Sequence, residues 1–299
     1  MLITRHAEAR ALLADPRYVP PPVRQDGEPG TLAWLRSQVS RFSHGEVHAE
    51  RRRLLTACLA TLDADALRSA AGSLTLERAG DWRDVPTEVL GAALGFADTG
   101  RLARVVRTAA TGYLSGVESA EADAAVTELT RLAGGATPES VARITLLLQA
   151  HAATEDLIAT ALTHATPGGA APAEPDIAPL ARTNHGTTVL APAVPDTTVL
   201  TPAVSGGEVD GLVYETLRHD PPVKVTRRVD RQTGAEVVVD LVAANRDPDV
   251  FGDPGRFDAS RGETPHLTFG AGVRPCPASR HGLALAAGVL EALLGTVDE

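Results

Sequence analysis

The most informative part of the chain is HLTFGAGVRPC, residues 266–276. Two glycines and a phenylalanine precede a lone cysteine, Cys276, which we place at the start of a helix over residues 276–294. Backbone N–H groups and the helix dipole both lower the energy of a thiolate, so Cys276 is poised to ionise and bind a soft or borderline metal. The glycines let the backbone fold tightly around the sulfur. This stretch therefore predicts a cysteine ligand.

The kind of metal follows from the neighbours of Cys276. No second cysteine or histidine stands at ligand spacing, which argues against a zinc site. A single thiolate fits an iron that four porphyrin nitrogens already hold, so haem is the natural candidate. The other cysteine, Cys58, has no glycine loop around it and is expected to be a buried structural residue.

Composition excludes several classes of protein. The 299 residues are 43% hydrophobic, enough for a substantial core, and aromatics make up only 3%. A formal charge of −10 argues against a nucleic-acid binder. Two cysteines cannot form a disulfide framework, the first residues lack the apolar core of a signal peptide, and no apolar run is long enough to span a bilayer. We therefore expect a cytoplasmic protein that binds neither nucleic acid nor membrane.

Hydrophobic periodicity predicts a mainly α fold with a minor β part. The expected helices cover residues 5–13, 32–43, 46–60, 141–163, 209–219 and 276–294, and short strands are expected within 223–242. We interpret residues 1–299 as one domain with an insertion rich in proline, alanine and threonine at about 166–211. A ten-residue repeat, TTVLAPAVPD then TTVLTPAVSG, fills residues 187–206 of that insertion; an ordered hairpin and a loose insertion are equally compatible with it.

The cysteine stretch resembles a known family. The pattern Phe269-Gly270-x-Gly272-x-Arg274-x-Cys276 is similar to the haem-binding loop of the cytochrome P-450 superfamily, and other motifs follow in the family's order. The resemblance implies a truncated cytochrome P-450-like fold, haem b as cofactor and Cys276 as the axial iron ligand. Phe269, Gly270, Gly272 and Arg274 are then expected to bind the cofactor.

Further matches concern charged side chains. The haem propionates need cationic partners, and the resemblance offers His48 and Arg52 on one helix, with Arg228 and Arg274 elsewhere. Glu215-Thr-Leu-Arg218 looks like the family's E-x-x-R pair, at a spacing that lets the two charges meet. Arg256 matches the third member of that ion-pair trio. We expect this trio to hold the core on the cysteine side of the haem.

The helix over residues 141–163 corresponds to the family's distal helix, and here the sequence departs from the pattern. An acid and an alcohol usually help deliver protons to dioxygen, a task that methyl groups cannot perform. Their positions are Ala152 and Ala153. We therefore name as candidate catalytic residues Gln149, His151 and Thr154. A role for His151 in packing alone is the alternative.

Three functional hypotheses follow from this resemblance. The first is a haem-thiolate oxidoreductase of mono-oxygenase type that acts on a small organic molecule in bacterial secondary metabolism. The second is a haem-dependent reaction without reductive oxygen activation, such as peroxide-driven oxidation, dehydration, cyclisation or rearrangement. The third is a non-catalytic auxiliary partner of another enzyme; retention of Cys276 and Arg274 argues against it.

Expected partners depend on the surface and on the chain's length. The basic run Arg51–Arg53 could receive a ferredoxin-type redox partner, or it could be solvated. The chain stops soon after its last helix, without the strands that help roof the substrate pocket in the family. This leaves open an exposed pocket, a large or carrier-bound substrate, or a second subunit that completes the site in a homodimer.

Overall fold

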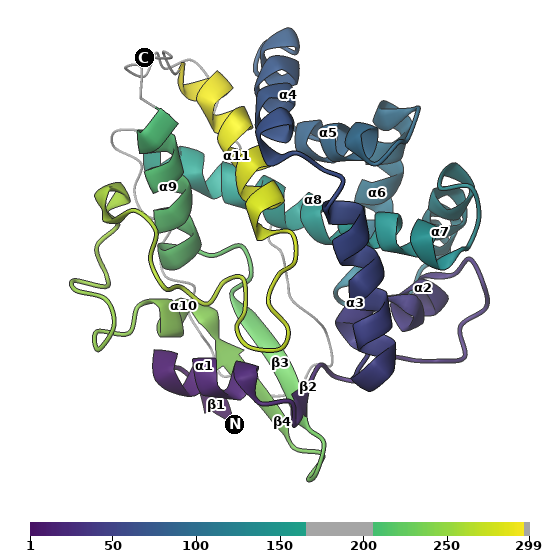
Figure 1. Ribbon diagram of the computed structural model, residues 1–299, viewed down its shortest axis with the longest axis horizontal. Coiled ribbons are helices and arrows are strands. Elements are labelled where there is room, and N and C mark those ends of the chain that lie inside the picture. Colours follow the sequence, from purple (N-terminus) through teal and green to yellow (C-terminus); the bar gives the residue numbers. More distant parts are fainter. Residues whose placement is uncertain (166–205, 296–299) are drawn as a thin grey trace.

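The computed structural model describes residues 1–165 and 206–295. Figure 1 shows helices packed together over most of the molecule, with a small sheet and α1 at one end. The helices are α1 (His6–Ala14), α2 (Leu32–Gln38), η1 (Ser40–Phe42), α3 (Gly45–Leu59), α4 (Ala64–Glu77), α5 (Val85–Ala93), α6 (Thr99–Tyr113), α7 (Ala120–Leu132), α8 (Pro138–Ala165), α9 (Gly206–His219), α10 (Leu241–Asn245), η2 (Ala259–Arg261) and α11 (Ser279–Leu294). The strands are β1 (Leu2–Ile3), β2 (Tyr18–Val19), β3 (Val225–Asp230) and β4 (Glu236–Asp240).

Helix α8 is the centre of the helical body. It contacts α3, α5, α6, α7, α9 and α11, because apolar side chains such as Ile144, Leu147 and Ile158 are fully buried on several of its faces. Its first turn is capped by Thr137, whose Oγ1 accepts the Ser140 N–H at 3.2 Å. The expected long buried helix is therefore confirmed, with slightly wider bounds than 141–163.

Helix α11 is fixed against α4 by a close backbone approach. A Cβ at Gly288 would lie 2.0 Å from the carbonyl oxygen of Arg68, so only glycine fits this crossing. The Arg68 side chain reinforces the contact by pairing with Glu291 of α11 and, at 2.9 Å, with Asp210 of α9. Because α11 follows the cysteine loop directly, this packing determines where that loop ends.

The sheet joins distant parts of the chain in the order β1-β4-β3-β2. Strands β3 and β4 form an antiparallel pair, which confirms the strands expected within 223–242, and β1 pairs in parallel with β4. The strands β1 and β2 were not predicted, because two residues carry no readable period. A small core under the sheet, including Ile3, Val239 and Leu267, packs against α1 and the start of the cysteine loop.

Two element boundaries differ from the sequence prediction. The helix expected over 32–43 divides into α2 and η1. The Arg51 guanidinium donates hydrogen bonds to the carbonyls of Ser37 and Val39, at 2.6 and 3.4 Å. In a continuous helix these carbonyls would accept hydrogen bonds from backbone N–H groups of the helix. The last helix begins at Ser279 and not at Cys276, with Ala278 as its N-cap.

The expected insertion at 166–211 is also shorter at one end, because residues 206–211 form the start of α9. The repeat over 187–206, apart from its last residue, lies outside the described residues. That residues 1–299 form one domain stays a prediction.

Candidate functional site

The loop before α11 folds back on itself around Cys276. The Cys276 N–H donates to the Phe269 carbonyl at 2.7 Å, and the Gly270 N–H donates to the Leu267 carbonyl at 2.8 Å. Both turn glycines have positive φ, +75° at Gly270 and +65° at Gly272. A Cβ at Gly272 would lie 2.2 Å from the Cα of Ala14, so this glycine also allows the loop to rest on the end of α1.

Cys276 itself is exposed. Desolvation by the surrounding protein raises the pKa of its thiol, while the backbone N–H of Ala278 and the charges of Arg52 and Arg41 favour the thiolate. The sequence prediction of a thiolate held by the first turn of a helix therefore needs correction, because α11 starts at Ser279. The sulfur relies on one N–H group and two arginines for stabilisation.

Cationic side chains surround this thiol. The Arg52 guanidinium donates to the carbonyl of Pro275, next to Cys276, and Arg274 donates to the Ser43 carbonyl at 2.7 Å, which ties the loop to the chain just before α3. Arg228 lies on β3 and donates to the hydroxyl of Thr226 at 2.6 Å. Three of the predicted propionate partners thus have hydrogen bonds to backbone or hydroxyl oxygens.

The electrostatics of this cluster require an anion. Burial, with the nearby charges of Arg41 and Arg274, lowers the pKa of Arg228 to about 10. Burial, with Arg274 and Arg52, lowers the pKa of His48 to about 4. Among the described residues, no ion pair joins Arg52, Arg228 or Arg274 to a carboxylate.

Like charges gathered without an acid fit a ligand that brings its own negative charge. A haem carries two propionates as well as an iron that a thiolate can bind, so the donor set fits that group. Arg41 is a member of the cluster that sequence reasoning missed. No motif marks it, and only the fold brings η1 close to β3 and the cysteine loop.

The structure assembles the buried ion pair but changes its third member. Glu215 and Arg218 are fully buried and paired at 2.6 Å. Arg218 also donates to the carbonyls of Asn245, Pro254 and Arg256 at 2.9–3.1 Å. Arg256 therefore contributes its backbone, while its side chain is exposed.

The second arginine beside Glu215 is Arg261, whose Nε lies 3.4 Å from the carboxylate. Our expectation that Arg256 supplies this charge was wrong. The connection between α10 and η2 turns so that the carbonyl of residue 256 and the side chain of residue 261 point inward. Sequence order alone could not distinguish two arginines five residues apart.

The candidate catalytic residues of α8 are engaged with neighbouring helices. Gln149 donates to the Tyr113 hydroxyl of α6 at 3.3 Å, and the Nδ1 atom of His151 lies 2.9 Å from the Thr87 hydroxyl of α5. Thr154 is buried. Ala152 and Ala153 are less buried than His151 and Thr154. A catalytic role for Gln149, His151 or Thr154 stays a prediction.

Helix α8 carries an acid that sequence reasoning overlooked. Asp156 comes four residues after Ala152 and so lies on the same face of the helix. Burial raises its pKa, and Lys224, the only lysine, acts against this shift. The signal that could have found it is the helical spacing from Ala152.

The basic run Arg51–Arg53 is not a free cationic patch. Arg51 donates to the Ser37 carbonyl, Arg52 to the Pro275 carbonyl, and Arg53 to Glu50. Only Arg53 is exposed, and its partner neutralises it. Arg51 ties α3 to the chain before it, and Arg52 ties α3 to the cysteine loop.

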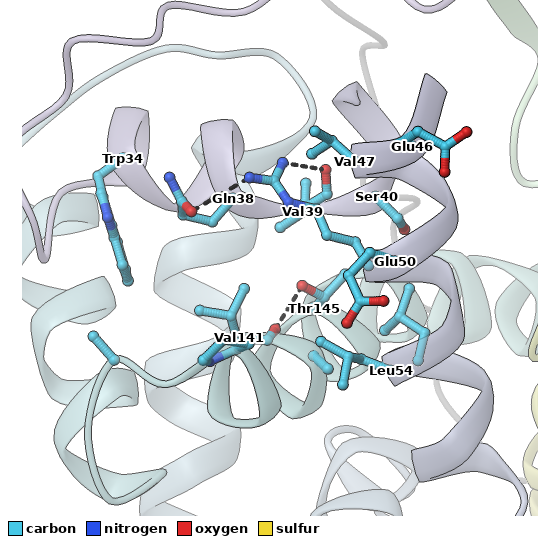
Figure 2. A pocket seen from close by; sticks show the side chains of 15 residues that line it. Trp34, Gln38, Val39, Ser40, Glu46, Val47, Glu50, Leu54, Val141 and Thr145 are labelled. Carbon is cyan, nitrogen blue, oxygen red and sulfur yellow. Dashed lines mark hydrogen bonds between the residues drawn. The ribbon is translucent and has the colours of Figure 1, made fainter. Parts of the chain in front are cut away.

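A separate cavity of about 520 Å³ lies between α2, α3 and α8. Figure 2 shows Val39, Val47, Leu54 and Val141 around it, with Glu46 and Glu50 at its edge. Its lining from α3 consists of residues 46, 47, 50, 51, 54 and 55, whereas His48 and Arg52 belong to the cationic cluster. The cavity is mostly apolar and contains none of the predicted site residues.

The fold and the cysteine loop together define a shortened cytochrome P450 fold. The solved structure of P450BioI, in complex with an acyl carrier protein ligated to hexadec-9Z-enoic acid, has a similar fold. The structural match covers 98% of this chain and 84% of the P450BioI chain, with a TM-score of 0.69 and 18% sequence identity. No family model matches the chain.

Curated relatives match shorter stretches. The biotin biosynthesis cytochrome P450 of Bacillus subtilis (strain 168) is 39% identical over 74 residues, which cover 21% of this chain and 19% of the relative. The cyclomarin C epoxidase CymV of Salinispora arenicola (strain CNS-205) is 35% identical over 80 residues, or 23% of this chain and 20% of the relative. The matched part thus spans about a fifth of each relative. Within residues 1–165 and 206–295, no helix has the length and apolar character to cross a membrane.

Proposed function

We propose that the protein is a haem-thiolate enzyme of the cytochrome P450 type, with haem b as cofactor and Cys276 as the axial ligand. The observation that carries this proposal is the cluster of Arg52, Arg228, Arg274 and His48. Arg52 lies beside the thiol, and the residues that the structure describes give this cluster no acidic partner. A bound haem supplies oxidative chemistry at its iron. The chain's own residues neutralise the propionates, and the turn through Gly270 and Gly272 presents the sulfur.

A carbon monoxide difference spectrum tests this assignment. Protein expressed with ample haem supply is expected to bind haem and, when reduced with carbon monoxide, to show the long-wavelength Soret band of thiolate ligation. Cys276→Ala should lose that band, whereas Cys58→Ala, a matched change at the other cysteine, should keep it. Absence of haem from the wild-type protein would favour the auxiliary-partner hypothesis, and an unchanged spectrum in Cys276→Ala would reject the ligand.

Within this class, we propose an oxidoreductase of mono-oxygenase type acting on a small organic molecule in bacterial secondary metabolism. The name of the relative CymV, an epoxidase, supports this choice. Asp156 lies on the same face of α8 as Ala152, which stands where the family usually has an acid, so Asp156 could supply the missing carboxyl group. A carrier-bound substrate is part of the proposal, since P450BioI was solved with an acyl carrier protein. A ferredoxin-type donor would have to bind elsewhere than Arg51–Arg53.

The alternative is a haem-dependent reaction without reductive oxygen activation, as in peroxide-driven oxidation, dehydration, cyclisation or rearrangement. The observation that favours it is the pair of methyl groups at Ala152 and Ala153, with Gln149 and His151 bonded to other helices. Oxygen consumption with a surrogate ferredoxin and reductase, compared with peroxide consumption, separates the two. If Asp156 delivers protons to the reaction, Asp156→Asn should slow oxygen consumption and leave peroxide consumption unchanged.

A further inference from the structure

The structure holds a second cluster of metal-binding side chains, on the side of α8 that faces α5. Asp84, His151 and Glu155 each place one ligand atom within 4.8 Å of the others. His151 and Glu155 are one turn apart on α8, and Asp84 immediately precedes α5. We propose that this cluster is a structural zinc site that links α5 to α8.

The distances suit a small divalent ion. Zn²⁺ binds nitrogen and oxygen ligands at about 2.0–2.2 Å, so the ligand atoms of a tetrahedral site lie about 3.4 Å apart. The Nδ1 atom of His151 lies 3.6 Å from Oε1 of Glu155. The Asp84 N–H donates to that same Oε1 at 3.0 Å, which holds the carboxylate beside the loop. Small side-chain movements would complete the geometry.

The cluster also has an unsatisfied atom. Asp84 is a non-glycine residue held at φ +65°, and its Oδ1 is buried without a hydrogen-bond partner. Its other oxygen pairs with Arg107. A buried carboxylate oxygen without a donor is costly. A metal ion would satisfy that oxygen.

Charge favours a cation at this cluster. A neutral imidazole is the form of histidine that binds metals. The Nδ1 atom of His151 lies 2.9 Å from the Thr87 hydroxyl, which donates to it when the ring proton is on Nε2. Two carboxylates face one guanidinium, so negative charge exceeds positive charge at the cluster. Histidine nitrogens and carboxylate oxygens are both ligands that Zn²⁺ takes in proteins.

A comparable cluster of His164, His219 and Asp220 is already filled by a cation of the chain. Arg246 donates to Nδ1 of His219 at 3.1 Å and to Oδ1 of Asp220 at 3.2 Å. The other carboxylate oxygen lies 2.9 Å from Nε2 of His164 and 3.0 Å from Nδ1 of His219. Because the guanidinium occupies the atoms a metal would need, this second cluster serves as the internal control.

Zinc binding to the full-length protein as purified, with or without haem, tests the proposal. After treatment with a chelator and dialysis, titration calorimetry with ZnCl₂ and metal analysis should show one equivalent bound, with a higher melting temperature in Zn²⁺. Asp84→Asn and Glu155→Gln should each weaken zinc binding by at least about 10-fold. Even the loss of a residue that only hydrogen-bonds to a metal ligand costs about this much affinity. His164→Asn should bind as the wild type does.

Three results would overturn the proposal. These are a wild-type protein that retains no zinc, an Asp84→Asn protein that binds zinc unchanged, and a His164→Asn protein that loses it. Circular dichroism identifies variants that fail to fold; if Asp84→Asn does so, Glu155→Gln decides. None of these outcomes depends on turnover, so the zinc site and the proposed enzymatic function are tested separately.

Discussion

Replacing Arg218 by leucine should destabilise the protein more than any surface charge replacement. Arg218 and Glu215 are fully buried, and the guanidinium also satisfies three backbone carbonyls. Removing one partner of a buried ion pair costs about 3–5 kcal/mol, because the other charge is left without compensation. Whole proteins are stable by only about 5–15 kcal/mol. Arg218→Leu therefore removes a large share of the free energy of unfolding.

Thermal unfolding followed by far-ultraviolet circular dichroism measures this effect. At about 2 °C per kcal/mol for a chain of this size, we expect the melting temperature to fall by roughly 6–10 °C. The matched control is Arg227→Leu, whose partner is Glu236 and whose side chains are 43% and 48% exposed. An exposed pair contributes about 0–1 kcal/mol, so the control should shift by no more than about 2 °C.

A double replacement sharpens the test. Glu215→Leu combined with Arg218→Leu removes the buried carboxylate as well and leaves only Arg261, whose side chain is 18% exposed. The double variant should therefore be more stable than Arg218→Leu alone. Equal melting temperatures for Arg218→Leu and Arg227→Leu would refute the reasoning. So would a double variant that is less stable than the single one, because the loss would then come from packing rather than from an uncompensated carboxylate.

Other expectations follow from the same site. Gly272→Ala should reduce the haem content, because the added Cβ would collide with Ala14. In the control Gly252→Ala, no atom lies within 4 Å of the added Cβ, so the haem content should not change. Equal haem contents of the two variants, measured by absorbance, would contradict this. The folded-state pKa of His48 is lowered from 6.5 to about 4, so as the pH falls the unfolded chain binds a proton at His48 before the folded protein does. The free energy of unfolding of the haem-free protein should therefore decrease as the pH drops from about 6.5 to about 4. His48→Gln should flatten the decline in urea titrations, and an unchanged slope would show that His48 does not contribute. Arg228→Gln should speed haem transfer to an apomyoglobin acceptor, and an unchanged rate would remove Arg228 from the propionate partners.

The cysteine loop could be identified from residues alone because its chemistry is local. Glycines at fixed offsets from Cys276 define the turn, and both have the positive φ that such a turn requires. The long helix α8 could also be predicted from local sequence, because a helix that is apolar on nearly all faces must be buried in the core. Glu215 and Arg218 meet at three residues' separation on one helix, so their pairing also followed from spacing.

Contacts between distant segments could not be predicted in this way. Arg261 rather than Arg256 approaches Glu215, Arg41 joins the cationic cluster, and His151 contacts α5. Each depends on how a loop turns or on which face of a helix meets its neighbour. These are decided by packing between segments far apart in the chain, and neither periodicity nor motif spacing encodes them. The sequence by itself determined the turn that presents Cys276, because the glycines and the cysteine lie close together in the chain. Only the tertiary structure decided which charges surround that sulfur.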